Sequence, residues 1–182
     1  ATLETFDLSR VDPRACHVSI ANRRVEGVPL FDATFTDDAG VSGRLGPLGS
    51  VSEIGLTESE PSRLTDPGSE SRRAVLTEVR QSRHEAVVLI TRGSRPGLFL
   101  LNAPAFTAPF GPPTLQVSSA EAAWLRDSAQ VRAQVTLVAK VDRTAARASN
   151  VTARIAGVDP SLAPIVVSTP RSAWWRSAGE RG

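Results

Sequence analysis

The sequence predicts an α/β (α+β) fold, in which a mixed sheet or open barrel is flanked by two or three helices. Residues 70–83 repeat apolar side chains at helical spacing, and the uninterrupted apolar run AVVLIT (86–91) follows directly. Residues 131–141 alternate apolar and polar side chains, as a half-buried strand does. PIVVST (164–169) is β-branched and apolar on both faces, which is typical of a central strand in a covered sheet.

The composition is that of an ordinary soluble globular protein. Of 182 residues, 41% are hydrophobic and 22% are charged, enough for one domain or one and a fraction. No apolar run approaches the roughly 18 residues that a membrane-spanning helix needs. The 21 basic and 19 acidic side chains are scattered, without the basic cluster that follows a phosphate backbone. We therefore expect no membrane and no nucleic-acid partner, and the composition indicates no particular compartment.

The first seventy residues predict mainly strands and turns. Residues 1–10 alternate, with Phe6 and Leu8 on one apolar face, and CHVSI (16–20) predicts a second short strand. Residues 36–71 are rich in Gly, Pro, Ser, Asp and Glu, which predicts loops with short strands. Within them, GRLGPLG (43–49) lacks the spacing and the lysine of a phosphate-binding loop, so we expect it to form turns.

Two helices are predicted between the strands. In residues 70–83 the apolar stripe consists of Ala74, Val75, Leu76 and Val79, and LFLL (98–101) predicts a short strand after AVVLIT. Residues 114–117 predict another short strand, after which Ser118 and Glu121 form a capping box for a second helix. Its predicted buried side consists of Ala122, Ala123, Leu125 and Ala129, with Trp124 at the edge.

The single cysteine and the two histidines predict no metal site by themselves. Cys16 excludes an internal disulfide, and its neighbour His17 points to the opposite face of a strand. We expect Cys16 to be half-buried rather than reactive. His84 is expected at the surface, where the first helix gives way to a strand.

Residues 102–113 predict a stiff loop, because four prolines exclude a helix. The loop presents Phe106 and Phe110, and a proline-stiffened aromatic loop loses little entropy when it binds a partner. Both side chains are therefore candidate binding residues for a peptide or a protein. The alternative is that the two rings cover the rim of the domain's own core.

The last thirty residues contain a strand pattern, NVTARI (150–155), a turn-rich linker, and the run PIVVST, which continues into Pro170, Arg171, Ser172, Ala173, Trp174 and Trp175. This order resembles the M28 family of zinc aminopeptidases, in which an "NVIA" strand, a loop and an "IVVGAHYDSW" strand end supply the first metal ligands. The resemblance implies a peptidase-like sheet to which these strands and residues 1–10 belong as neighbours.

The resemblance also implies that the first metal ligands are lost. The family pattern has a His and an Asp two residues apart, and Pro170 and Ser172 occupy those places here. Zinc needs imidazole, thiolate or carboxylate ligands, which neither residue supplies. Glu180 is a candidate remnant of a further family carboxylate, but Arg181 lies beside it. We therefore assign no catalytic residue, no metal ligand and no cofactor to this chain.

Residues 20–145 resemble a protease-associated (PA) domain: a helix before an AVVLITRG-like strand, a "P-x-LQVSS" strand, a second helix, and a long strand leading to "N-V". The two resemblances predict that 1–19 and 143–182 are strands of a truncated M28-like core, and that 20–142 is an inserted PA-like domain. Because the chain begins at Ala1 and has no methionine, we expect a cut or processed piece of a longer product.

Three functional hypotheses follow. The first is a non-catalytic PA-like binding or lid module of an M28 peptidase-like protein. The second is a fragment of an active zinc-dependent aminopeptidase whose remaining catalytic residues follow Gly182, with zinc as its cofactor. The third is an interaction module unrelated to peptidases. The first is preferred, with a peptide or protein, or the remainder of its own catalytic-like domain, as partner.

Arg171, Trp174 and Trp175 are the other candidate binding residues, because they follow a predicted strand at the end where α/β sheets bind ligands. The alternative for the two tryptophans is that they pack beneath a neighbouring helix. The alternative for Arg171 is an ordinary surface ion pair.

Overall fold

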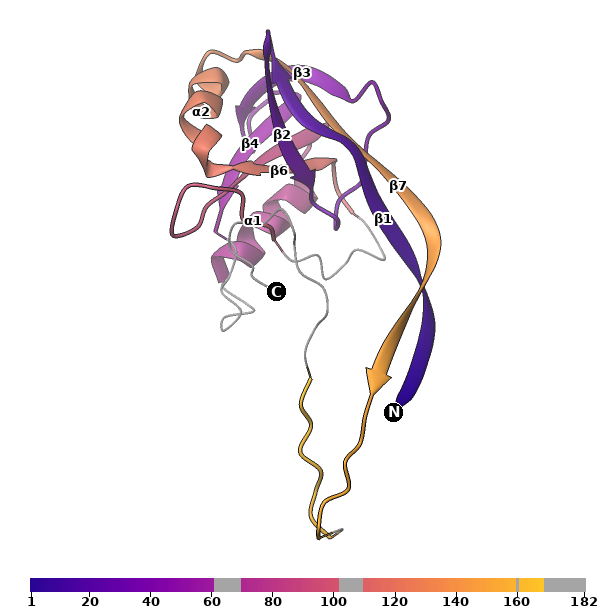
Figure 1. Cartoon of the computed structure of the whole chain (residues 1–182). Coiled ribbons are helices and arrows are strands. Elements are labelled where there is room, and N and C mark those ends of the chain that lie inside the picture. Colours follow the sequence, from indigo (N-terminus) through magenta and orange to yellow (C-terminus); the bar gives the residue numbers. More distant parts are fainter. Residues whose placement is uncertain (61–69, 102–109, 160, 169–182) are drawn as a thin grey trace.

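The structure, a computed structural model, describes residues 1–60, 70–101, 110–159 and 161–168, with the side chains of α1 described from Ala74 onward (Figure 1). Its strands are β1 (Thr2–Ile20), β2 (Arg23–Pro29), β3 (Val41–Pro47), β4 (Ile54–Ser59), β5 (Ala86–Thr91), β6 (Thr114–Ser118) and β7 (Gln134–Thr152). Its helices are α1 (Glu70–Gln81), the short 3-10 helix η1 (Ser119–Glu121) and α2 (Ala122–Gln130). Neither described α-helix is long and apolar enough to cross a bilayer.

The strands form a ring-like mixed sheet in the order β1-β2-β6-β5-β4-β3-β7. The last strand in this order, β7, pairs with the first, β1. Neighbours from β3 to β6 are parallel, whereas β1, β2 and β7 join the ring by antiparallel pairing. This arrangement confirms the predicted α+β class with a mixed sheet. The two predicted helices and the predicted strands at 86–91 and 114–117 are also confirmed.

Two apolar clusters hold the ring and its helices together. The larger cluster takes alternate side chains from every strand, among them Leu45, Leu115 and Leu137, and α2 adds Ala122, Leu125 and Ala129. The smaller cluster joins Leu89, on the other face of β5, to Leu30, Ala33 and Leu101, and Val75 and Leu76 of α1 pack against it. All six residues of β5 are buried because helix and ring cover opposite faces of the strand.

The strands β1 and β7 are each 19 residues long and pair along almost their whole length. Residues 15–20 and 134–140 belong to the ring. We call the ring, with its connecting loops and with α1 and α2, the ring body. Residues 2–12 and 142–152 form a two-stranded extension, which we call the ribbon. Figure 1 shows the ribbon leading away from the ring body, with the start of β1 beside the end of β7.

The ribbon confirms one predicted pairing and corrects another. Residues 1–10 and 150–152 are neighbours, since Leu3 pairs with Val151. Residues 164–168, however, form no strand, and Ile165 is 93% exposed. A strand needs neighbouring backbone groups for its N–H and C=O groups, and none of the described strands pairs with this run. We call residues 153–159 and 161–168 the tail.

Other local predictions were wrong in detail. Residues 98–101 form no strand, because side chains rather than a ladder satisfy their backbone: Phe99 N–H donates to Thr91 Oγ1 and Leu101 N–H donates to Gln116 Oε1. Residues 43–47 lie in β3 instead of a turn. Ala123 and Val131 are exposed, because α2 turns Ala123 away from the core and β7 begins only at Gln134.

His84 is buried, which contradicts its predicted place at the surface. Its Nδ1 lies 2.6 Å from the Ser52 carbonyl oxygen, and its Nε2 accepts the Gly49 N–H at 2.9 Å. The ring is therefore the tautomer that carries its proton on Nδ1. It also lies against Gly55, where a Cβ would come within 2.6 Å of the ring. His84 thus joins the β3–β4 connection to the start of β5.

Candidate functional site

Most of the candidate residues from the sequence lie outside the described residues. These are Phe106, Pro170, Arg171, Ser172, Trp174, Trp175 and Glu180. The ligand positions and the tryptophan pair therefore stay predictions.

Phe110 is the one candidate binding residue that the structure describes. It is partly buried, and the Arg80 guanidinium of α1 lies 3.6 Å from its ring centroid. Its backbone N–H donates to the Asp32 carbonyl oxygen. A partly buried ring stacked with arginine gains from the cation–π contact. This geometry is that of a ring covering the rim of its own domain, and a binding role for Phe110 stays a prediction.

The ribbon and the tail carry most of the large apolar side chains that the described chain exposes. They are Leu3, Phe6, Val151, Ile155, Val158, Leu162, Ile165, Val166 and Val167, whereas only Val51 and Val131 belong to the ring body. On one face of the ribbon, Phe6 pairs across with Ala148, and Leu8 with Ala146. A two-stranded ribbon alone is marginally stable in water, so an apolar face on it indicates a surface for another chain segment or partner.

The outer edges of the ribbon are also unpaired. Within the described chain, β2 pairs with β1 only from His17 to Ile20, and β3 pairs with β7 only from Gln134 to Leu137. An unpaired edge presents backbone N–H and C=O groups to which a further strand can add. The ribbon therefore combines an apolar face with two edges open to pairing.

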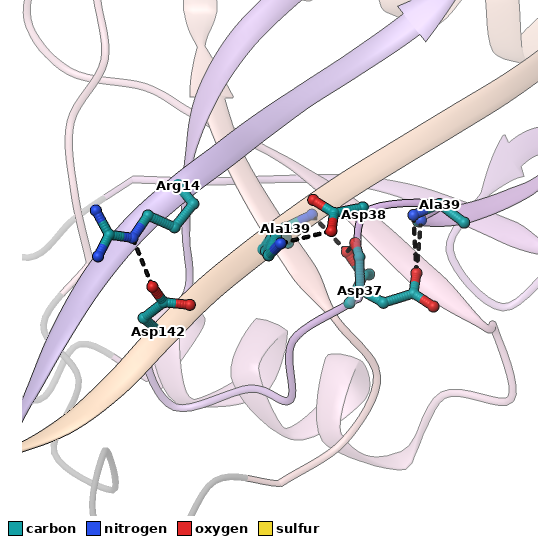
Figure 2. A network of polar contacts seen from close by, with 9 residues as sticks. Arg14, Asp37, Asp38, Ala39, Ala139 and Asp142 are labelled. Atoms are coloured by element: carbon teal, nitrogen blue, oxygen red, sulfur yellow. Dashed lines mark hydrogen bonds and ion pairs between the residues drawn. The ribbon is translucent and has the colours of Figure 1, made fainter.

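A network of charged side chains surrounds the base of the ribbon (Figure 2). Arg14 of β1 donates to Asp142 of β7 at 2.7 Å, and this ion pair raises the pKa of the Arg14 guanidinium. Lys140 forms an ion pair with Asp38, in the loop between β2 and β3. In the same loop, Asp37 Oδ1 accepts the N–H groups of Ala39 and Gly40, both at 3.0 Å.

A second charged group lies at the carboxyl ends of the parallel strands β4 and β5, where open α/β sheets bind their ligands. Glu58 accepts from Arg92, which follows β5, and from Arg126 of α2. All three side chains are partly exposed. One carboxylate between two guanidinium groups ties α2 to the ends of two strands and leaves the group with a net positive charge.

The remaining ionisable candidates do not form a metal site. The Cys16 thiol is buried in the ring and contacts the Lys140 carbonyl oxygen, whereas His17 points to the other face. Burial of the His17 imidazole, reinforced by Arg24, lowers its pKa, and its Nδ1 is buried without a hydrogen-bond partner. The described residues contain no group of three His, Cys, Asp or Glu side chains that fits a metal ion.

Comparisons with known proteins place this fold. No family model matches the chain, and no curated protein matches it. A solved peptidase M28 precursor from Shewanella amazonensis SB2B matches over 82% of this chain and 39% of its own, with a TM-score of 0.54 and 13% identity. The zinc aminopeptidase BSAP from Bacillus subtilis matches over 80% and 35%, with a TM-score of 0.50 and 14% identity.

An aminopeptidase from Aneurinibacillus sp. strain AM-1 gives the same result, with a TM-score of 0.51, 14% identity and coverage of 81% of this chain and 36% of its own. At such identities the likeness concerns the fold alone. The chain spans less than two fifths of each of these three proteins. It therefore shares its fold with a part of M28-type aminopeptidases.

Sequence reasoning missed the ribbon base and the Glu58 group. Arg14 and Asp142 are 128 positions apart, and Glu58 and Arg126 are 68 apart, so only pairing of distant strands brings them together. The one available signal was the long alternation that ends in β7, which predicted a strand but not its partner.

Proposed function

We propose that the chain is a non-catalytic, PA-like binding or lid module of an M28 peptidase-like protein that has lost its first metal ligands. The pairing of β1 with β7 carries the proposal. It brings residues 2–12 beside 142–152, while the residues between them fold into the ring body. A domain inserted into another domain has its two ends side by side in this way. The likeness to a part of three peptidase structures supports the same role.

In this proposal the ribbon joins the remainder of a catalytic-like domain. Its apolar face and unpaired edges supply the contact. The tail supplies further exposed apolar side chains to the same contact, since Val166 and Val167 are 83% and 90% exposed. The predicted division assigns residues 1–19 and 143–182 to that core and 20–142 to the module. Because Cys16 and Val18 pack in the ring cluster, we propose that residues 15–19 go with the module. The module's own partner is a peptide or protein, with Phe106 and Phe110 as candidate contacts.

The described histidines and cysteine, and the residues at the two predicted ligand places, do not fit the zinc ion that the fold family implies. Both nitrogens of His84 are engaged by backbone groups, and Cys16 and His17 point to opposite faces of β1. Pro170 and Ser172, at the places of the first ligands, offer no imidazole or carboxylate. No catalytic step is therefore assigned to this chain.

The alternative is a fragment of a working zinc-dependent aminopeptidase, whose catalytic residues lie outside this chain. It is favoured by two of the similar structures, which are named as aminopeptidases, one of them as a zinc enzyme. In this alternative the chain still contributes the ring body and the ribbon, and the metal is held elsewhere.

Metal analysis of the longest natural protein that contains this chain tests the proposal. We expect less than about a tenth of a zinc ion per chain and no hydrolysis of a panel of aminoacyl anilides. A matched variant, Pro170→His with Ser172→Asp, restores both family ligands and is expected to raise zinc uptake. One zinc ion per chain together with turnover in the unaltered protein would establish the alternative instead.

A further inference from the structure

The ribbon leaves the ring body at an irregularity in β1. Pro13 pairs with Val141 and Ala15 pairs with Lys140, so two steps along β1 correspond to one step along β7. Arg14 is the extra residue of this bulge and has no register partner on β7. A bulge bends its strand and increases the local twist, so Arg14 sets the direction in which the ribbon leaves.

The ladder is also weakest at this point. Pro13 has no N–H to donate, and the extra residue interrupts the regular alternation of hydrogen bonds. The large apolar cluster ends nearby, since Cys16 on β1 and Ala139 on β7 are its last members toward the ribbon within the described chain. Backbone pairing and core packing therefore both diminish over the same few residues.

Beyond the end of the apolar cluster, contacts between exposed charged side chains join β1, β7 and the neighbouring loop. Arg14 and Asp142 are 54% and 43% exposed and join the two strands across the bulge. On the body side, Lys140 pairs with Asp38 of the loop that precedes β3. On the ribbon side, the Arg143 guanidinium lies 5.3 Å from the ring centroid of Phe35, in the same loop. Contacts of this kind are weak and are screened by salt.

We propose that the bulge at Pro13–Ala15 is a hinge between the ring body and the ribbon, and that the Arg14–Asp142 ion pair holds its angle. Hinges of this type are a few residues that absorb a change of backbone direction while the elements on both sides stay rigid. Here the rigid parts are the packed ring and the paired ribbon. The hinge belongs to this chain alone and does not require the function proposed above.

A change at the hinge is large enough to measure. Because a strand rises about 3.3 Å per residue, the ribbon is about 35 Å long, and a change of ~10° moves its tip by about 6 Å. Pulsed electron paramagnetic resonance between spin labels at Val131→Cys, in the ring body, and Val151→Cys, near the tip, reads this distance. The only native thiol, Cys16, is replaced by alanine in all samples.

Two variants separate the bulge from the ion pair. Deleting Arg14 restores regular pairing of Pro13 and Ala15 without changing any other β1–β7 pair, and is expected to move the distance maximum by about 6 Å or more. Arg14→Ala keeps the bulge, and is expected to broaden the distribution around the same maximum. Raising the salt to about 1 M, where charges are screened within about 3 Å, should broaden the distribution of the parent more than that of Arg14→Ala, which has already lost the Arg14–Asp142 pair.

The hinge proposal is wrong if deleting Arg14 leaves the maximum of the distance distribution unchanged, or if Arg14→Ala leaves its width unchanged. If the deletion variant does not fold, as judged by circular dichroism, hydrogen exchange on the parent decides. The amides of residues 11, 12, 14, 15 and 140–143 should then exchange faster than those of 17–19 and 136–138, and also faster than those of 5–9 and 145–149. A steady rise in exchange toward the tip, without a local maximum at the bulge, overturns the proposal.

Discussion

The two halves of β7 have the same backbone conformation and different surroundings. From Gln134 to Lys140 the strand pairs with β3 as far as Leu137 and with β1 from Thr136 onward, and it buries Val135, Leu137 and Ala139 in the ring. From Asp142 to Thr152 it has one neighbour; eight of its eleven residues are exposed and the other three are partly buried. Alternation of side chains therefore produces a strand in both halves, but only the first half has a core. Stability should reside in the ring body, and availability for contact in the ribbon.

The largest expected effect tests this contrast with one residue type on the two sides. Leu137→Ala removes a fully buried side chain and should lower the free energy of unfolding by about 2–5 kcal/mol. Leu3→Ala, in the ribbon, should change it by less than about 0.5 kcal/mol, because Leu3 is 66% exposed. Urea unfolding followed by circular dichroism measures both. Equal losses would mean that the ribbon is as tightly packed as the ring.

The next effect concerns the buried histidine of the ring body. His84→Ala leaves the Ser52 carbonyl and the Gly49 N–H without their partner and opens space beside Gly55. We expect a loss of about 2–3 kcal/mol, the combined cost of two unsatisfied groups and a cavity. The matched control, Arg83→Ala, changes an exposed neighbour and should cost less than about 0.5 kcal/mol. Thermal unfolding of both variants gives the comparison.

A pH-dependent effect follows from His17, on the outer side of β1. Burial and then Arg24 lower the pKa of its imidazole from 6.5, so the folded state binds this proton more weakly than the unfolded chain does. Stability should therefore fall as the pH drops from about 6.5 toward the lower folded-state pKa. Replacing His17 with Gln should remove that part of the pH dependence. Unfolding free energies at several pH values above and below 6.5 test it, and identical slopes in the two proteins would contradict it.

The smallest effect is expected at Glu58. Glu58→Gln weakens two partly exposed ion pairs, with Arg92 and Arg126, and should cost about 0.5–1 kcal/mol. The loss should shrink at high salt, because screening weakens the original pairs. Glu60→Gln is the control, since Glu60 is exposed at the end of the same region. A larger loss that salt does not change would show that Glu58 acts through packing instead.

The sequence predicted best where one segment is sufficient to define its own structure. The helical stripe gave α1, the apolar run gave β5, and the polar start after Ser118 gave η1 and α2. Ser118 accepts the Ala120 N–H as a cap, while Glu121 reaches Arg23 of β2 instead of completing the capping box. The prediction failed where a residue's partner is remote in the sequence. The polarity of His84 indicated a place at the surface, but backbone groups of Gly49 and Ser52 form hydrogen bonds with both of its ring nitrogens in the interior.

By itself, the sequence determined the α+β class and the positions of most helices and strands, because periodicity and apolar runs act over a few residues. Only the tertiary structure decided which strands meet. It paired the first strand in the sequence, β1, with the last, β7, and so formed the ribbon. These two strands exchange backbone hydrogen bonds although more than a hundred residues separate them in the sequence. It left the equally strand-like run at 164–168 unpaired, because a strand depends on a neighbour, and a neighbour is not encoded in the run itself.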